Sequence, residues 1–520
     1  MKLATSNLSW RLSPIILITA VLTLFFTPLT SAQQPVPNKV TGATIYYVSP
    51  NGNDTDGLTW NTAFTSIWDA ITAANFGDEI WVAAGSYIPG NAANVSFNLK
   101  SGVAMYGGFV GNEMQREQRD WFTNPTILTG DLGGDDANSN GIVLSPSDIV
   151  GTNSIHVVTA QAVTENTVLD GFVITAGNAS ASSGLNSRGG GFYCAGSGEG
   201  NQCNPTLSNI QFSGNYAGTG GAMYLDGNPT GESHPTLTNI IFSGNVADYG
   251  GAIYHAEQYQ STDNLKLTNV IFLENTASES GGAIYHYGSI MSLTNVTFYQ
   301  NLAARGGAIA NDIATDLIMT NVILWGNSAT DLGMAIFNGY SHIELTSSLV
   351  QGGVNGPGID NSEGGTITDV EGNIAGDPLF VDAANGNLRL QAESPAIDTG
   401  INVLNSAPTD LDGNPRIIHV RTDMGAYETP FYTLTVSVAG SGNGAVNATG
   451  IGCGGDCTES YAHGAQIILT AVPEPNNAFS GWSGGCSGTG DCELTITADT
   501  AVSATFSPEY RLYLPTVIKP

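Results

Sequence analysis

The chain is poor in charged residues, and above all in basic ones. Only 14 of its 520 residues are Lys or Arg, against 45 Asp and Glu, so the formal net charge is −31. Such a charge repels phosphate-rich partners, which excludes nucleic acid and anionic membrane surfaces. Divalent cations and neutral sugars are compatible with it, although acidity also serves simply to keep an exported protein soluble.

Long apolar stretches are also scarce. A positively charged end, an apolar run from Ile15 to Phe26 and small residues up to Ala32 are typical of a secretory signal peptide over residues 1–32, cleaved near Ala32. The run is short for a membrane span, and no other stretch approaches that length. We therefore expect a monomeric mature protein without a transmembrane segment, secreted or held at the cell surface, in the extracellular space or cell envelope.

Cysteine is rare, but its spacing is informative. Close local pairs in an exported chain indicate disulfides, whereas zinc binding is the alternative. The irregular spacings, with no histidine beside the pairs, favour disulfides. Pairing among the last four cysteines stays open, since four cysteines allow three connectivities. The candidate pairs are Cys194 with Cys203, Cys453 with Cys457, and Cys486 with Cys492.

One sequence phrase recurs through the middle of the chain. Its copies start 30, 30, 26, 26 and 26 residues apart, and a Gly-Gly-Ala step follows most of them. So short a period indicates a solenoid in which each unit buries its apolar face against its neighbours. The units carry short runs of alternating β-branched and aromatic residues. We predict an all-β, right-handed parallel β-helix with coils about 4.7–4.9 Å apart. The copies begin at Leu207, Leu237, Leu267, Leu293, Met319 and, in decayed form, Leu345.

Equivalent positions of the repeat should stack into columns along the coil axis. Two columns are apolar and are expected inside: Phe212, Phe242, Phe272, Phe298, Leu324; and Met223, Ile253, Ile284, Ile309, Ile336. Two are asparagine: Asn209, Asn239, Asn269, Asn295, Asn321; and Asn215, Asn245, Asn275, Asn301, Asn327. Stacked amides can hydrogen-bond along a column, and Asn tolerates left-handed corners, so we interpret both asparagine columns as structural.

The pair of signatures Phe242-Ser243-Gly244-Asn245 and Gly250-Gly251-Ala252-Ile253, with its copies, closely resembles the repeats of chlamydial polymorphic membrane proteins. The resemblance covers roughly residues 169–350. It implies a β-helix on a surface-exposed, adhesin-like protein. The C-terminal membrane barrel of that family has no counterpart in this sequence, so its export route does not transfer.

Before the repeats, a linker over residues 33–43 leads into an N-terminal cap and first coils over 44–110. Phe64, Ile67, Trp68 and Ile71 lie on one face at helical spacing, which predicts a capping helix over 62–75. Such a cap covers the unpaired edge of the first coil. This opening resembles the entry of pectate-lyase-like β-helix proteins.

Two further segments follow the repeats. Residues 372–428, with Asp410-Leu411-Asp412-Gly413 and Asp423 to Glu428, closely resemble the choice-of-anchor Q module. We expect them to complete the β-helix, which would then span 44–428, and we interpret their carboxylates as structural. Residues 432–507 resemble the divergent internalin-B-type bacterial repeat, a small β domain. Residues 508–520 form a tail and a candidate sorting segment.

An acidic, glycine-rich loop offers a candidate metal site. Asp131, Asp135 and Asp136 provide the oxygen ligands that Ca²⁺ favours. The loop lacks any EF-hand spacing, so a simply solvated loop is the alternative. Ca²⁺ is the one cofactor that the sequence suggests.

An aromatic column offers a candidate binding surface. Alternation should turn these rings outward, because the neighbouring isoleucine column points inward. An exposed aromatic stripe would suit sugar rings or protein anchors, whereas mutual stacking without a ligand is the alternative. The adjoining column places His255 and His286 one coil apart, as a corner pair without metal in that alternative. The candidate ligand-binding residues are Tyr193, Tyr224, Tyr254, Tyr285 and Phe337.

Two classes of function remain. A polysaccharide lyase on this fold needs a basic residue beside Ca²⁺-binding carboxylates, yet Lys266 and Arg305 are the only Lys or Arg between residues 207 and 350. The aspartate motifs of pectin hydrolases are missing too. We favour a non-enzymatic surface or matrix protein, without catalytic residues, that binds a glycan or a cell-surface protein. An enzyme acting on acidic polysaccharide is the alternative.

Overall fold

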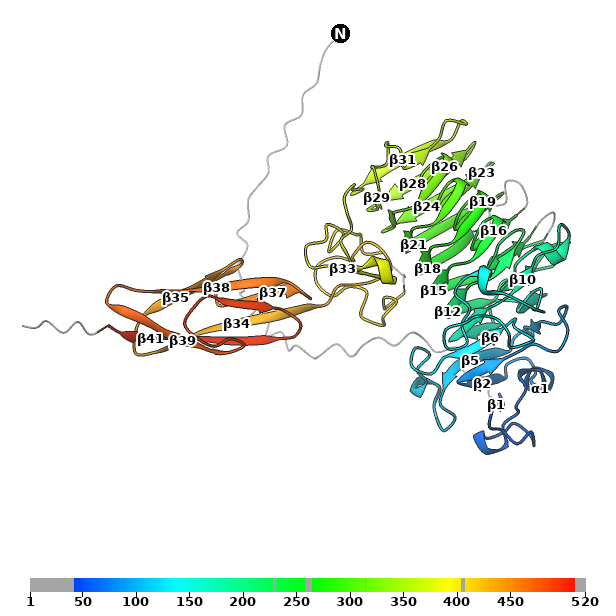
Figure 1. The fold of residues 1–520 in the computed structure, drawn as a ribbon, viewed down its shortest axis with the longest axis horizontal. Coiled ribbons are helices and arrows are strands. Elements are labelled where there is room, and N and C mark those ends of the chain that lie inside the picture. The colour runs from blue at the N-terminus through cyan, green and yellow to red at the C-terminus, as the bar shows by residue number, and fades with distance from the viewer. Residues whose placement is uncertain are drawn as a thin grey trace, which may run out of the picture. The chain divides into compact units, whose positions relative to one another are not determined.

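The computed structural model describes residues 42–199, 201–227, 231–257, 264–313, 315–403 and 407–509. The expected signal peptide lies outside them, as do most of the linker and of the tail. Three parallel sheets run through the repeats, and each of the first five repeat coils contributes a strand to every sheet (Figure 1). The parallel β-helix predicted from the repeat is therefore confirmed. We call the coils from β1 to β31 the tube.

The first sheet contains sixteen strands. Its strands pair in parallel and in register, so that each Leu-x-Asn phrase lies on the next. The strands are β1 (Ile45–Val48), β2 (Glu79–Ala83), β3 (Gly85–Tyr87), β5 (Ala104–Phe109), β6 (Thr126–Thr129), β8 (Val168–Asp170), β9 (Phe172–Thr175), β12 (Thr206–Ser213), β15 (Thr236–Ser243), β18 (Asn264–Leu273), β21 (Ile290–Tyr299), β24 (Asp316–Thr320), β25 (Ile323–Trp325), β28 (His342–Thr346), β29 (Leu349–Val350) and β31 (Thr366–Glu371).

Two smaller sheets close the tube. The six-stranded sheet comprises β10 (Asn178–Ala179), β13 (Tyr216–Ala217), β16 (Val246–Tyr249), β19 (Thr276–Ser280), β22 (Leu302–Arg305) and β26 (Ser328–Leu332). The nine-stranded sheet comprises β4 (Phe97–Asn98), β7 (Val158–Gln161), β11 (Phe192–Ala195), β14 (Met223–Asp226), β17 (Ile253–Ala256), β20 (Ile284–Tyr287), β23 (Ile309–Asp312), β27 (Ile336–Gly339) and β30 (Ile359–Asp360). Each of these coils thus runs from the first sheet through the six-stranded sheet to the nine-stranded sheet, and then returns to the first sheet.

The predicted apolar columns form the core of the tube. Every member of the phenylalanine and isoleucine columns is fully buried. The Phe272 and Phe298 rings stack with centroids 4.7 Å apart and planes within 5°. That separation equals the spacing of neighbouring strands, so the backbone repeat itself brings the rings into van der Waals contact.

The two asparagine columns differ in how they turn the chain. The Asn209 column itself adopts the left-handed conformation, with φ between 53° and 56°. In the other column the preceding residue takes that conformation, for example Gly214 and Glu274. The amides of both columns form a ladder. In the second column, Asn245 Nδ2 donates to Asn275 Oδ1 at 2.9 Å and to the Phe212 carbonyl at 3.1 Å. Both columns shape corners, as predicted.

The N-terminal capping helix is shorter than the predicted 62–75. Helix α1 spans Ile67–Ala73 and buries Ile67, Ala70 and Ile71. Phe64 instead pairs with β1, since its N–H donates to the Tyr47 carbonyl at 2.9 Å. Strand pairing therefore overrides the helical spacing at the N-terminal end. The remaining short helices are 3₁₀ turns: η1 (Trp60–Thr62), η2 (Arg116–Gln118), η3 (Pro146–Asp148), η4 (Leu185–Ser187) and η5 (Ala383–Asn385).

Residues 378–428, here called the lateral module, differ from the expected final coils. Ile374 still continues a coil by bridging to Leu349. Beyond it, β32 (Phe380–Asp382) and β33 (Asn387–Leu390) pair only with each other, antiparallel. The module packs its apolar residues on the outer face of the first sheet, because that face carries aliphatic side chains there. The contacting cluster includes Phe380, Leu388, Leu390, Ala396 and Leu411 of the module with Ile271, Ile323 and Leu349 of the tube.

The C-terminal domain consists of two four-stranded sheets around a core of its own. Its strands are β34 (Phe431–Gly440), β35 (Gly444–Ala448), β36 (Ile451–Cys453), β37 (Thr458–Ala462), β38 (Gln466–Pro473), β39 (Asn477–Gly484), β40 (Cys492–Thr495) and β41 (Thr500–Pro508). Neighbouring strands are antiparallel except for β34 and β41. All three predicted disulfides form, which resolves the pairing that the sequence left open: Cys194–Cys203, Cys453–Cys457 and Cys486–Cys492.

Candidate functional site

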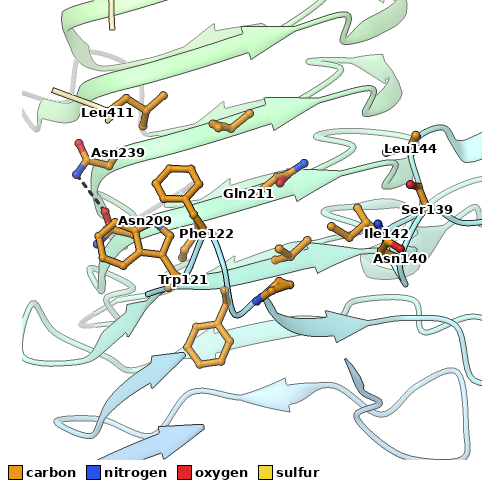
Figure 2. A pocket seen from close by; sticks show the side chains of 16 residues that line it. Trp121, Phe122, Ser139, Asn140, Ile142, Leu144, Asn209, Gln211, Asn239 and Leu411 are labelled. Carbon is orange, nitrogen blue, oxygen red and sulfur yellow. Dashed lines mark hydrogen bonds between the residues drawn. The ribbon is translucent and has the colours of Figure 1, made fainter. Parts of the chain in front are cut away.

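A groove of about 290 Å³ lies on the outer face of the first sheet. Strands β9, β12 and β15 form its floor, through Val173, Gln211 and Ile241. One wall is Trp121 with Phe122, and the loop from Ser139 to Leu144 faces it across the floor (Figure 2). Leu411 of the lateral module closes one end of the groove. Residues from Trp121 to Leu411 in the sequence therefore build this site.

The aromatic wall belongs to a loop whose backbone is hydrogen-bonded to its own carboxylates. Glu113 accepts hydrogen bonds from three successive backbone N–H groups, those of residues 110–112. Asp120 accepts the Phe122 N–H at 3.0 Å, which fixes the backbone that carries this ring. The Trp121 and Phe122 ring centroids lie 5.7 Å apart, and Phe122 is 60% exposed. A large ring presented to solvent by an ordered loop is typical of a binding contact.

A chain of hydrogen bonds crosses the floor beside that wall. Asn209 Nδ2 donates to Asp170 Oδ1 at 2.7 Å, and Asn239 Nδ2 donates to Asn209 Oδ1 at 3.0 Å. Arg119 anchors the start of the chain through its 2.8 Å ion pair with Asp170. These bonds fix the orientation of both amides. They present polar edges at defined positions next to an apolar surface.

The lining is aromatic, aliphatic, amide and hydroxyl throughout. Apolar faces with a few fixed polar groups suit a sugar ring, which has an apolar face of C–H groups and a rim of hydroxyls. The groove is therefore chemically suited to a neutral, polyhydroxylated ligand.

The predicted aromatic column is a ladder of stacked rings. Tyr224 and Tyr254 stack with centroids 5.1 Å apart, and Tyr254 and Tyr285 at 4.9 Å. Tyr193, Tyr224 and Phe337 are each less than a tenth exposed, while Tyr254 and Tyr285 are half-buried. An exposed stripe is therefore wrong for three of the five residues. Neighbouring rings cover Tyr193 and Tyr224, and the Arg305 guanidinium lies over the Phe337 ring.

Polar side chains hold the outer edge of this ladder. The Tyr193 hydroxyl donates to Asp226 at 2.8 Å, and the Arg188 guanidinium lies 4.8 Å from the Tyr224 ring centroid. Burial raises the pKa of Tyr254 to about 12 and also raises that of Tyr224. The hydroxyls are therefore protonated, and the ladder acts as a second, outer core.

The adjoining column points inward, as alternation predicts. His255 and His286 are fully buried, and their rings stack at 5.4 Å with planes within 3°. His286 Nδ1 lies 3.0 Å from Asn311 Oδ1. Burial lowers the pKa of His286 to about 3, so this ring is neutral.

The three aspartates of the candidate calcium site do converge, with one oxygen of each within 4.8 Å of the others. Much of their hydrogen-bonding capacity serves the loop itself. Asp131 accepts the N–H groups of Gly134, Asp135 and Asp136, and Asp136 accepts that of Val150 at 2.7 Å. Calcium binding at Asp131, Asp135 and Asp136 stays a prediction.

The carboxylates of the lateral module are buried around one arginine. Arg416 Nε lies 3.2 Å from Glu428 Oε1, and both residues are about a twentieth exposed. Asp423 accepts the N–H groups of Asp398 and Thr429. Burial raises the pKa of Asp423 to about 6 and also raises that of Glu428. These contacts are internal to the module, in keeping with the structural role that we assigned.

Sequence reasoning missed the groove. Trp121 and Phe122 lie outside the repeat, and periodicity gives no information on an irregular loop. Adjacent large aromatics within a polar stretch were the available signal. The floor residues, by contrast, occupy repeat positions whose outward direction alternation does predict.

These features define a parallel β-helix protein with a surface groove, and two family comparisons refine that class. Residues 239–256 and 269–287 match the Chlamydia polymorphic membrane protein repeat. Residues 434–509 match the divergent InlB B-repeat domain. Both resemblances inferred from the motifs are thereby confirmed, whereas that of residues 372–428 to the choice-of-anchor Q module stays a prediction.

Among solved structures, the crystal structure of pectate lyase Pel9A is similar to this chain. The similarity covers 75% of this chain and 98% of the lyase, with 14% sequence identity and a TM-score of 0.39. No curated protein sequence matches the chain. Among the described residues, no helix is both long and apolar enough to cross a membrane.

Proposed function

We propose that this chain is an exported, non-enzymatic β-helix protein that binds a neutral glycan in the groove between Phe122 and the loop 139–144. One observation carries the proposal: an aromatic ring that is 60% exposed lies beside a preorganised row of amides. The signal-like N-terminus and the match to a surface-protein repeat support a location outside the cell.

Binding would use the two parts of the groove differently. The Phe122 and Trp121 rings would stack on the apolar face of a sugar, while the Asn209 and Asn239 amides would hydrogen-bond its hydroxyls. Because the loop and the hydrogen-bonded row are already ordered, little conformational entropy is lost on binding. The neutral lining supports an uncharged glycan over an acidic polysaccharide or a strongly charged protein.

A glycan array probed with the purified chain would identify ligands, and calorimetry would then give the affinity of the best neutral oligosaccharide. Since an aromatic contact contributes about 0.5–1.5 kcal/mol beyond burial, Phe122→Ala should weaken binding about 2- to 10-fold. Phe76, which is 69% exposed and lies outside the groove, supplies the control Phe76→Ala, with unchanged affinity.

A parallel assay separates binding from catalysis. The chain is incubated with pectate, alginate and similar acidic polymers, and unsaturated products or reducing ends are measured. We expect no turnover. Turnover by the wild type that is lost on substitution of a carboxylate would establish the enzyme alternative.

A further inference from the structure

Three side chains that commonly bind metals meet at a corner of the tube. His255 points inward from β17, Glu257 follows the end of that strand, and His234 precedes β15 in the loop from β14. His255 and Glu257 are fully buried, and the His234 side chain is 11% exposed. The trio shares no residue with the groove.

The distances within this trio suit ligands around one ion. His234 Nε2 and His255 Nε2 lie 3.3 Å and 3.6 Å from the same oxygen, Glu257 Oε1. Zinc bonds of about 2.0–2.2 Å in a tetrahedron place ligand atoms about 3.3–3.6 Å apart. The two imidazole planes cross at 88°, so both Nε2 atoms approach the carboxylate from different directions.

Neighbouring groups hold the three ligands in place. The Ser233 N–H donates to Glu257 Oε1 at 2.9 Å, and the His234 N–H donates to Asn204 Oδ1 at 2.8 Å. The ring of His255 is fixed by its stack on His286. A Cβ atom on Gly227 would lie 2.0 Å from Glu257 Oε1, so glycine at that position leaves room for the carboxylate. Such support is typical of a preorganised metal site.

We propose that His234, His255 and Glu257 bind a divalent transition metal ion of the zinc class. Two imidazoles and one carboxylate are a borderline-soft donor set, which Zn²⁺ prefers and which Ca²⁺ and Mg²⁺, as hard ions, do not. A water molecule would complete the tetrahedron. The ion would join the segment that enters β15 to the segment that leaves β17, and so fasten this corner of the coil.

The test uses the full chain without a histidine tag, stripped with EDTA and titrated with Zn²⁺ by calorimetry. We expect one Zn²⁺ per chain and no competition from excess Ca²⁺. Substitution of Co²⁺ should give the visible absorption of a tetrahedral site. His234→Ala and Glu257→Gln should each weaken binding at least 10-fold. His463, exposed in the C-terminal domain, supplies the control His463→Ala, with unchanged affinity.

A second measurement needs no variant and therefore does not depend on variant folding. Diethyl pyrocarbonate modifies accessible imidazoles, and peptide mass spectrometry reads each site. Zn²⁺ should protect His234 in the wild type while His463 reacts at the same rate. A wild type that binds no Zn²⁺, equal affinity in His234→Ala, or unprotected His234 would each overturn the proposal.

Discussion

The asparagine ladder of the tube and the lateral module bury polar groups in opposite ways. Inside the tube the ladder of Asn245, Asn275 and their equivalents consists of neutral amides, each bonded to the same group one coil away. The module instead buries ionisable groups, with Arg416 paired to Glu428. In a repeat, one hydrogen-bonding pattern satisfies the neutral amides of every coil. A single buried cation instead needs a set of partners that occurs only once in the chain.

The two regions should also differ in how far a local defect affects the free energy of unfolding. A defect in a column of the tube removes contacts from the coils on both sides, as in other solenoids. The module rests on the tube through one apolar cluster and a few bonds, such as that from Asn321 Nδ2 to the Ile401 carbonyl at 2.9 Å. We therefore expect defects in the tube to spread and defects in the module to stay local.

The largest effect should come from the outer aromatic ladder. Replacing Tyr224, Tyr254 and Tyr285 together by Ala removes three consecutive stacked rings. A buried aromatic costs about 3–5 kcal/mol when truncated, so the triple variant should fail to fold. Circular dichroism and thermal melting provide the measurement, with Tyr340→Phe at an exposed position as the control. A triple variant that melts like the wild type would show that the ladder carries little stability.

The inner amide ladder comes next. Asn275 is fully buried, and its Nδ2 donates to the Phe242 carbonyl at 2.9 Å while its Oδ1 accepts from Asn245. Asn275→Ala leaves these groups unsatisfied, at about 1–3 kcal/mol each. Urea unfolding should show a loss of about 2–5 kcal/mol in the tube. The exposed Asn91→Ala should change nothing measurable. A comparable loss of stability in both variants would contradict a stabilising role of the amide ladder.

The lateral module should respond more locally. Leu388 is 2% exposed within the cluster that joins the module to the tube. Leu388→Ala should cost about 2–5 kcal/mol. Hydrogen exchange followed by mass spectrometry should then show faster exchange over 378–428 and unchanged protection over β12 and β15. Loss of protection in both regions would mean that the module and the tube unfold as one unit.

The smallest effect should be the pH dependence of the module. The pKa of Asp423 is raised to about 6, and that of Glu428 is raised too, so the folded module holds protons that the unfolded chain has released. Stability is then full below the ordinary pKa near 4 and falls as pH rises, through about 6 for Asp423 and on to about 9 for Glu428, by about 1–3 kcal/mol for each group. Module exchange rates at pH 4.5 and 7.5, corrected for intrinsic exchange, measure this change. Glu428→Gln should reduce it. A wild-type module that gains stability over that interval would refute the assignment.

Much of the tube could be predicted because a repeat constrains itself. Once Phe242 and Phe272 are seen to be one period apart, strand spacing dictates that their rings stack. The same logic placed His255 and His286 one coil apart. It failed for Tyr224, since alternation gives the direction of a ring and not whether the neighbouring rings cover it. It failed also for Phe64, which strand pairing takes away from the expected helix.

The sequence by itself determined the parallel β-helix, the corner asparagines, the cysteine proximity and the separate C-terminal domain, because each depends on short-range periodicity or spacing. Only the tertiary structure decided where residues 378–428 pack, how Trp121 and Phe122 meet the strand floor, and that His234 approaches Glu257. These contacts join irregular segments to the repeat. The position of these segments on the repeat follows from side-chain packing in three dimensions. No periodic pattern in the sequence encodes it.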